Sequence, residues 1–157
     1  MRILYLHGLM SSNQSSKIDW LRLKHTVYSP HLNYNTESQS IFSGLKTLIK
    51  TNQIDLIIGS SMGGHLGFHL ANMFDIPSLL FNPSLAPNQV EKPAVEIMSN
   101  PNILHTVVLG INDDVVIPLD TIAFLNTSKS NYTITKESNG HRTPIDIFKK
   151  NFKALII

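Results

Sequence analysis

The chain has 157 residues, and we predict a single domain spanning residues 1–157. Hydrophobic residues make up 42% of the chain and charged residues only 15%, which indicates a core-forming chain rather than a disordered one. The formal net charge of +2 comes without the basic patch that a nucleic-acid-binding surface needs. The absence of cysteine excludes disulfides, thiol catalysis and cysteine-ligated metal sites.

The sequence also bears on membrane insertion and secretion. No apolar run is long enough to span a membrane, and the N-terminus lacks the apolar stretch of a signal peptide. We therefore expect a cytoplasmic protein without a membrane span. The residues indicate no oligomeric state.

Short apolar runs alternate with helical patterns through the first half of the chain. Strands are predicted at residues 3–6, 26–28 and 54–58, with a short helix at 18–23 between the first two. The run 54–58 is apolar nearly throughout, which is typical of a strand buried on both faces of a parallel sheet. A longer helix is predicted to begin with a capping box formed by Thr36 and Gln39 and to bury one apolar stripe, made of Ile41, Phe42, Leu45, Leu48 and Ile49.

The same alternation continues through the second half. Helices are predicted at residues 62–74, 94–98 and 119–125, and strands at 78–81, 106–109 and 132–135. A last helix is expected to begin with Thr143 as N-cap and Pro144 at the first position, and to bury Ile145, Phe148, Phe152, Leu155 and Ile156. Six strands alternating with helices predict an α/β fold, a mostly parallel six-stranded sheet with helices on both faces. Ligands of such sheets bind beyond the carboxyl ends of the strands.

One of these strand ends carries a candidate nucleophile. The third strand runs into Gly59-Ser60-Ser61-Met62-Gly63-Gly64 and then a helix, which is Gly-x-Ser-x-Gly in the strand–turn–helix context of a nucleophile elbow. Glycines are needed two residues before and after the serine, because the strained turn crowds those positions. Only Ser61 has glycine at both offsets, so we predict Ser61 as the nucleophile.

A serine of this kind needs a base, and the chain offers seven histidines. His141 is favoured because it lies in the loop between the sixth strand and the last helix, at the carboxyl edge of the sheet. The other histidines are placed elsewhere: His25 and His31 beside an edge strand, His65 and His69 on the helix after the serine, His105 at the far end of its strand, and His7 in a structural turn.

The base in turn needs a carboxylate that fixes its tautomer. The fifth strand ends in Gly110-Ile111-Asn112-Asp113-Asp114, which places two carboxylates at the correct edge. We favour Asp113 and keep Asp114 as the adjacent alternative; Asn-Asp sequences also serve as turn formers. Two backbone amides are predicted to hold an oxyanion, that of Met62 at the helix start and that of Leu9 after the Gly8 turn.

With these residues assembled, the chain resembles the α/β-hydrolase superfamily, and within it the small YqiA-like esterases. The resemblance rests on segments from one end to the other: Ile3-Leu4-Tyr5-Leu6-His7-Gly8 with Ser11-Ser12 and Lys17, Gly59 to Gly64, Asn82-Pro83-Ser84 with Pro87, and Gly140-His141. The order Ser61, Asp113, His141 is that of α/β-hydrolases. The resemblance implies a Ser-His-Asp hydrolase of carboxylic esters or thioesters that uses no cofactor.

The stretch between Phe81 and Thr106 is too short for a separate cap domain. We therefore expect an open, shallow site whose substrate pocket includes Met10 and Leu85, together with Leu9, Met62 and residues around 85–90. These side chains suit a small or extended acyl group. Arg142 beside the base is either an anion-binding residue or, as we favour, a solvated residue at the helix entrance.

The sequence as a whole predicts a serine esterase that acts on a small-molecule ester through an acyl-enzyme, without a cofactor and without a metal, since no metal-ligand spacing occurs. Two alternatives remain open at this point. The same machinery can hydrolyse acyl thioesters, and the fold can serve as a non-catalytic binding module.

Overall fold

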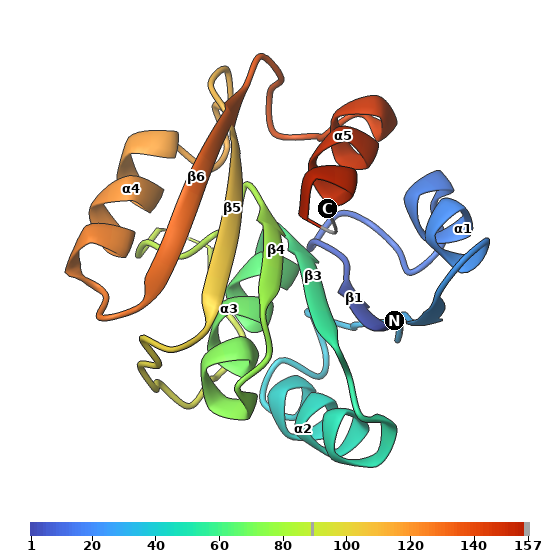
Figure 1. Cartoon of the computed structure of the whole chain (residues 1–157). Helices are drawn as coiled ribbons and strands as arrows, with labels where there is room; N and C mark the ends of the chain where they lie inside the picture. The colour runs from blue at the N-terminus through green and yellow to red at the C-terminus, as the bar shows by residue number, and fades with distance from the viewer. Residues whose placement is uncertain (89, 156–157) are drawn as a thin grey trace.

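One parallel sheet of six strands forms the centre of the protein, in the order β2-β1-β3-β4-β5-β6 (Figure 1). The computed structural model describes residues 1–88 and 90–155. All five neighbouring strand pairs are parallel, so every carboxyl end lies at the same edge of the sheet. The strands are β1 (Arg2–Leu6), β2 (Thr26–Tyr28), β3 (Leu56–Ser60), β4 (Ser78–Phe81), β5 (Leu104–Gly110) and β6 (Asn131–Glu137). The predicted α/β architecture is confirmed.

Helices cover both faces of this sheet. They are α1 (Ser16–Arg22), α2 (Ile41–Asn52), α3 (Met62–Phe74), α4 (Pro118–Thr127) and α5 (Ile145–Leu155). The buried clusters assign them to layers, because α1 and α5 share one cluster while α2 and α3 share another and α4 packs with α3. Figure 1 shows α4 beside β6 and α5 on the opposite side of the sheet.

The sequence of the central strands explains why both faces are covered. Alternate residues of β4 and β5 point to opposite layers: Leu79, Phe81 and Val108 pack with α1 and α5, whereas Leu80, Val107 and Leu109 pack with α3 and α4. Apart from Glu137 at the end of β6, the edge strands β2 and β6 consist of exposed or half-buried residues, as is typical of strands with one neighbour. The continuous apolar runs therefore mark the interior of the sheet.

The strand that leads to the candidate nucleophile ends two residues later than predicted. It covers Leu56–Ser60 rather than residues 54–58, so the backbone stays extended up to the residue before Ser61. The register pairs Gly59 with Leu6 of β1 and Ser60 with Phe81 of β4. The ends of three adjacent strands therefore surround the turn at Ser61.

The predicted helix at 94–98 is wrong. Within the described residues, the connection from β4 to β5 contains neither helix nor strand. Pro93 and Pro101 leave room for little more than two turns, and Ile97 is 81% exposed, so a helix here would not bury a continuous apolar face. It lies against the protein through Val95 and through an ion pair between Lys46 and Glu96.

Two helix starts also differ from the prediction. Ser40, not Thr36, precedes α2, and residues 34–36 and 38–40 form turns instead of a capping box. The Tyr34 hydroxyl donates to the His7 carbonyl, which ties this segment to the end of β1 and away from the helix axis. Helix α5 begins at Ile145, one residue after the predicted start, and Ile156 lies outside the described residues.

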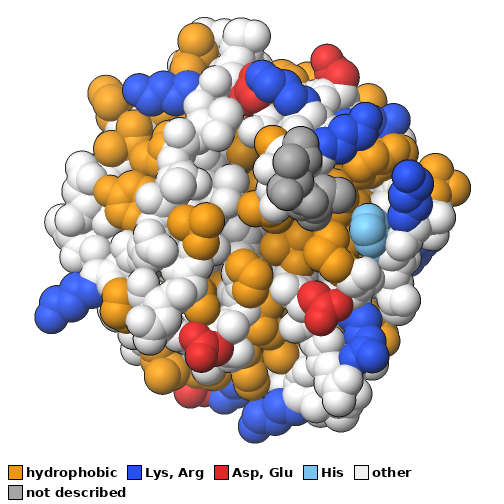
Figure 2. Space-filling model, viewed as in Figure 1, with side chains coloured by type: hydrophobic (Ala, Val, Ile, Leu, Met, Phe, Trp, Pro, Cys, Tyr) orange, Lys and Arg blue, Asp and Glu red, His pale blue; other side chains and the backbone are white. Residues whose placement is uncertain are grey.

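The surface seen in Figure 2 carries Lys and Arg side chains spread apart from one another, with Asp and Glu side chains among them. Across residues 1–88 and 90–155, no helix is both long and apolar enough to cross a bilayer.

Three buried histidines give the fold a predicted pH dependence. Burial lowers the pKa of His65 to about 3 and those of His69 and His105 to about 4. In the unfolded chain histidine has a pKa of about 6.5, so below that pH only the unfolded state binds these protons. The free energy of unfolding therefore does not depend on these histidines above pH 6.5. It decreases as the pH falls from 6.5 toward 4, by up to about 1.4 kcal/mol per pH unit for each histidine.

Urea unfolding at pH 7, 6 and 5 checks this expectation. We expect His69→Leu to reduce the pH dependence, whereas replacing the exposed His31 by Gln leaves it unchanged. A free energy of unfolding that stays constant from pH 7 to pH 5 would contradict it.

Candidate active site

Ser61 occupies a strained turn between β3 and α3. Its φ of 52° and ψ of −116° lie in a region that residues with side chains rarely adopt. The two flanking glycines allow the turn, since a Cβ on Gly59 would collide with the Gly63 backbone and one on Gly63 with the Leu6 carbonyl. Ser61 is half-buried and lies at the carboxyl edge of the sheet.

The loop after β1 lies directly against this serine. A Cβ on Gly8 would be 3.2 Å from Ser61 Cβ and 3.9 Å from its Oγ. The next residue, Leu9, therefore carries its amide close to the turn, while Met62 supplies one of the first amides of α3, which no helical carbonyl accepts. Both predicted oxyanion donors thus belong to backbone that flanks Ser61.

His7 holds this loop in place and is not available as a base. Its Nδ1–H donates to the Gly8 carbonyl over 2.8 Å, and its Nε2 accepts from the Leu32 amide over 3.0 Å. The ring is buried, and burial lowers its pKa. These contacts give His7 a structural role in the loop after β1.

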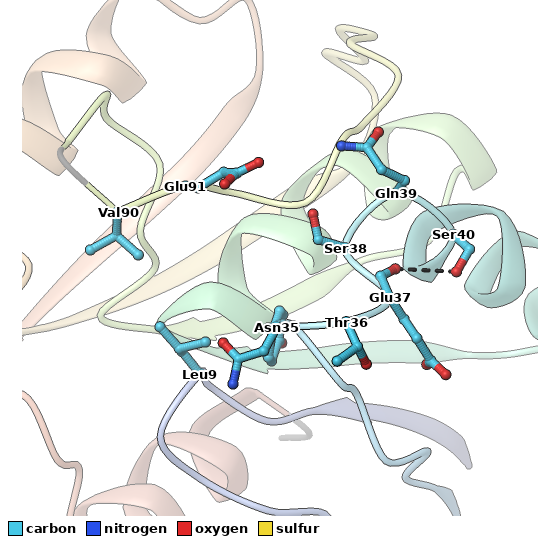
Figure 3. A pocket seen from close by; sticks show the side chains of 10 residues that line it. Leu9, Asn35, Thr36, Glu37, Ser38, Gln39, Ser40, Val90 and Glu91 are labelled. Carbon is cyan, nitrogen blue, oxygen red and sulfur yellow. Dashed lines mark hydrogen bonds between the residues drawn. The ribbon is translucent and has the colours of Figure 1, made fainter.

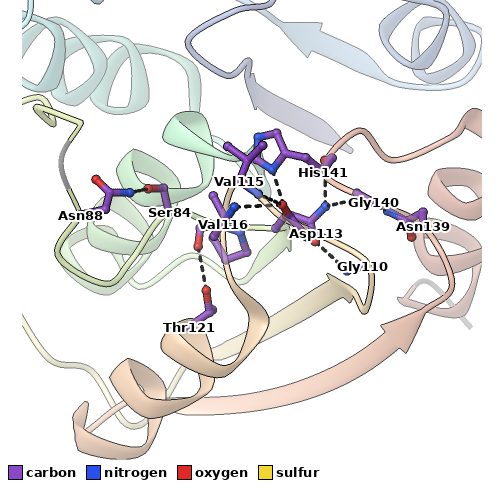
Figure 4. Close-up of polar contacts among 12 residues, drawn as sticks. Ser84, Asn88, Gly110, Asp113, Val115, Val116, Thr121, Asn139, Gly140 and His141 are labelled. Atoms are coloured by element: carbon purple, nitrogen blue, oxygen red, sulfur yellow. Dashed lines mark hydrogen bonds and ion pairs between the residues drawn. The ribbon is translucent and has the colours of Figure 1, made fainter.

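The structure brings His141 and Asp113 together (Figure 4). Nδ1 of His141 lies 2.9 Å from Oδ2 of Asp113, and the carboxylate is fully buried. Its other oxygen, Oδ1, accepts from the amides of Val115 and Val116, each over 2.9 Å. Because the carboxylate is fixed by two backbone amides, its second oxygen presents a defined acceptor to the imidazole. The His141 side chain is 24% exposed.

The adjacent carboxylate takes no part in this contact, since Asp114 is exposed. Between the described residues, no hydrogen bond joins the Ser61 hydroxyl to His141. The structure thus pairs the predicted acid with the predicted base and places the predicted nucleophile at the same edge of the sheet.

A second serine–histidine pair lies elsewhere in the fold. Ser78 Oγ is 2.8 Å from His105 Nδ1, and His105 Nε2 is 3.1 Å from Asn72 Oδ1. Ser78 and His105 have no exposed surface. Both lie near the amino ends of β4 and β5. These hydrogen bonds therefore connect β4, β5 and α3 inside the core, where a substrate has no access.

A cavity of about 500 Å³ adjoins the loop after β1 (Figure 3). Most of its lining is polar and comes from two irregular segments, residues 34–40 and 90–91, with Leu9 on a third side. The two side chains predicted for the substrate pocket do not line it: Met10 is 86% exposed, and Leu85 is buried in the cluster of α3 and α4. The side chain of Met62 is also buried in the core. Gln89, within the predicted 85–90 stretch, lies outside the described residues.

Arg142 is exposed at the entrance to α5. In the part of the chain that the structure describes, His, Asp and Glu side chains form no group of three that could hold a metal ion.

Sequence reasoning assigned no role to Asn82, which follows β4. Its side chain bonds to both the loop before Asp113 and the loop of His141. An asparagine before a proline at a strand end was the available signal, because asparagine tolerates positive φ in such turns. The partners of its side chain, 28 to 59 residues away along the chain, cannot be read from local pattern.

Comparisons with known proteins agree with this fold. The family described as "Uncharacterised protein family (UPF0227)" matches residues 2–121. Among curated protein sequences, none matches the chain.

Solved structures match nearly the whole chain at low sequence identity. MGS-MChE2, an alpha/beta hydrolase enzyme from a metagenome of lagoon sediments at Mar Chica, Morocco, has a TM-score of 0.72 at 18% identity, covering 99% of this chain and 89% of its own. Est1E of Butyrivibrio proteoclasticus with ferulic acid bound has a TM-score of 0.73 at 12% identity, with coverages of 99% and 87%. The type II thioesterase BorB of the borrelidin biosynthetic cluster has a TM-score of 0.63 at 16% identity, with coverages of 99% and 88%. At such identities the likeness establishes the α/β-hydrolase fold.

The approach of the two loops that carry Asp113 and His141 is tested by a pair of glycine variants. A Cβ on Gly110 would lie 2.5 Å from the carbonyl oxygen of Asn139 and 2.6 Å from that of Gly140, so Gly110→Ala forces the two loops apart. We expect it to lower the free energy of unfolding by about 1–3 kcal/mol in urea titrations. The control is Gly44→Ala in α2, where a Cβ meets nothing within 4 Å and stabilisation of about 0.5–1 kcal/mol is expected. Equal stabilities of the two variants would refute the close approach.

Proposed function

The chain belongs to the family UPF0227, and from its α/β-hydrolase fold we propose that it is a serine hydrolase that cleaves carboxylic esters through an acyl-enzyme. The observation that carries the proposal is the buried Asp113 carboxylate bonded to His141 Nδ1, at the sheet edge where Ser61 stands on a strained turn. A buried carboxylate bonded to a half-exposed imidazole is the acid–base half of a serine hydrolase site.

The proposed role of His141 depends on which of its two ring nitrogens carries the proton. An ionised carboxylate can only accept hydrogen bonds, and Asp113 Oδ1 already accepts two from backbone amides. Oδ2 therefore requires a proton on Nδ1 of His141, which leaves Nε2 with a free lone pair. That nitrogen is the atom that takes the proton of the Ser61 hydroxyl.

In the acylation step, Ser61 Oγ bonds to the ester carbonyl carbon while its proton passes to His141 Nε2. The carbonyl oxygen becomes an oxyanion that accepts hydrogen bonds from the Leu9 and Met62 amides, and the start of α3 favours this negative charge. The intermediate then collapses, the bond to the leaving alkoxide oxygen breaks, and His141 donates the proton to it. The alcohol leaves, and the acyl group remains on Ser61.

Deacylation repeats the sequence with water as the nucleophile. His141 Nε2 takes a proton from water as the water oxygen bonds to the acyl carbon, and the second oxyanion is held by the same amides. Collapse returns the proton to Ser61 Oγ and releases the carboxylic acid. Asp113 stabilises the imidazolium in both halves without itself being protonated. The absence of a Ser61–His141 hydrogen bond in this structure is compatible with the mechanism, because such bonds commonly shorten only when substrate is bound.

The cavity beside Leu9 supports a substrate with a polar, non-anionic group. Glu37 and Glu91 both line it, and the remaining polar side chains are neutral hydroxyls and amides. Carboxylates disfavour an anionic substrate group through like-charge repulsion, whereas hydroxyls and amides donate and accept hydrogen bonds. We therefore propose small neutral esters ahead of highly charged acyl thioesters.

The nucleophile is tested with a fluorophosphonate probe and with p-nitrophenyl acetate. We expect Ser61→Ala to abolish labelling and to lower kcat at least 1,000-fold, because no other group on the turn can form the acyl-enzyme. Ser60→Ala, one residue earlier and without the flanking glycines, is the matched control and should keep both. Labelling that persists in Ser61→Ala would rule out the assigned nucleophile, and absence of turnover on a broad ester panel would favour a binding module.

The acid is tested by two neighbouring amide substitutions. Asp113→Asn places an amide group against His141 and disfavours the protonated Nδ1, so kcat should fall by roughly 10,000-fold. Asp114→Asn changes an exposed side chain and should leave kcat within about twofold. Steady-state hydrolysis of p-nitrophenyl acetate by the two variants measures the difference, and similar losses in both would exclude Asp113 as the specific partner.

A further inference from the structure

Asn82 stands in an unusual backbone conformation beside the candidate site. It directly follows β4, is 1% exposed, and has a φ of 43°. The described residues include four non-glycine positions with positive φ, of which Gln53 and Asp75 end helices. The other two, Ser61 and Asn82, follow the adjacent strands β3 and β4 at the carboxyl edge. Backbone strain in this sheet therefore lies at the candidate site.

The side-chain amide of Asn82 joins the acid loop to the base loop. Its Oδ1 accepts from the Gly110 amide over 2.7 Å, three residues before Asp113. Its Nδ2 donates to the carbonyls of Gly140 over 3.2 Å and of His141 itself over 2.8 Å. These backbone partners converge in Figure 4, where Gly110, Gly140 and His141 are labelled.

The backbone around Asn82 is bonded to the nucleophile turn as well. The Ser61 amide donates to the Phe81 carbonyl, and the Ser84 amide donates to the Ser61 carbonyl, both over 3.0 Å. The Asn82 amide donates to the Val108 carbonyl of β5 over 2.9 Å. One short segment, residues 81–84, therefore contacts the backbone that carries all three proposed catalytic residues.

Few side chains meet these requirements together. The position needs tolerance of positive φ, one acceptor for an amide, and a donor group for two carbonyls, all on a side chain of this length. Aspartate has the shape but no donor when ionised, and it would set a carboxylate against the two carbonyl oxygens. Glycine tolerates the backbone conformation but makes none of the bonds.

We infer that Asn82 is a positioning residue that sets the distance between His141 and Asp113. The reason is that Asp113 is already fixed on its own loop, through Val115, Val116 and a turn to the Gly110 carbonyl. The loop of His141 is also bonded to that loop through Asn112, whose amide and side chain donate to the carbonyls of Asn139 and Ser138. Among the described residues, however, only the Asn82 side chain bonds to the backbone of His141 itself. The effect of Asn82 on catalysis rests on the proposed function, whereas its effect on the distance between His141 and Asp113 does not.

The test compares Asn82→Gly, which keeps the backbone conformation, with Asn82→Asp, which keeps the shape and removes the donors. Ser78→Ala is the matched structural control, because it removes a buried hydrogen bond, that to His105, from the other end of the same strand. Each protein is measured for melting temperature, for kcat and KM on p-nitrophenyl acetate, and for the NMR signal of the His141 Nδ1 proton.

We expect both Asn82 variants to lose at least 30-fold in kcat with KM changed less than threefold, and to shift or broaden the His141 Nδ1 proton signal. Ser78→Ala should lower the melting temperature but leave kcat and that signal unchanged. The proposal is overturned if the Asn82 variants melt like Ser78→Ala and keep wild-type kcat with an unchanged signal. If the wild-type protein hydrolyses no ester, the proposed function fails, and the proton signal alone decides whether Asn82 holds the pair. Should Asn82→Gly not fold, Asn82→Asp supplies the same readouts.

Discussion

The hydrogen bond from His141 to the buried Asp113 carboxylate is the interaction on which the site depends. It joins the loops that follow β5 and β6, two neighbouring strands of the sheet, and its carboxylate is fully buried. An unpaired carboxylate buried there would be costly, and the two amides of Val115 and Val116 together with the imidazole satisfy it. Because all strands are parallel, their carboxyl ends deliver these loops to the edge where the turn at Ser61 stands.

Close backbone approach at this edge requires small residues and strained conformations. Gly110 allows the acid loop to touch the base loop, and Gly59 and Gly63 allow the turn at Ser61. Such positions lower stability locally, and the covered sheet compensates, with residues such as Leu79, Leu80 and Val107 fully buried on both faces. Packing stabilises the middle of the sheet, and the proposed catalytic residues lie at its carboxyl edge.

The parts predicted from sequence are those written in local pattern. Buried parallel strands appear as continuous apolar runs, and the glycines two residues before and after Ser61 are typical of one kind of tight turn. Both features could therefore be predicted from the sequence. The His141 loop followed from topology, since the strand order decides which loops meet. The prediction of a helix at 94–98 was wrong because the segment follows Pro93 and exposes Ile97, so a helix there would not bury a continuous apolar face. Leu9 and Val90 of the cavity lining were included in the prediction, but residues 34–40 were missed because irregular segments have no periodicity. The bonds of the Asn82 side chain were missed because its partners are distant in sequence.

The account is tested most directly by a crystal structure of the protein after reaction with a small alkyl phosphonate. Its phosphorus atom takes the place of the tetrahedral carbon, and the phosphonyl oxygen takes that of the oxyanion. We expect phosphorus bonded to Ser61 Oγ, the phosphonyl oxygen about 2.7–3.1 Å from the Leu9 and Met62 amides, and His141 Nε2 facing the Ser61 oxygen while Nδ1 keeps its bond to Asp113. Phosphorus on another side chain, or a phosphonyl oxygen turned away from both amides, would contradict it.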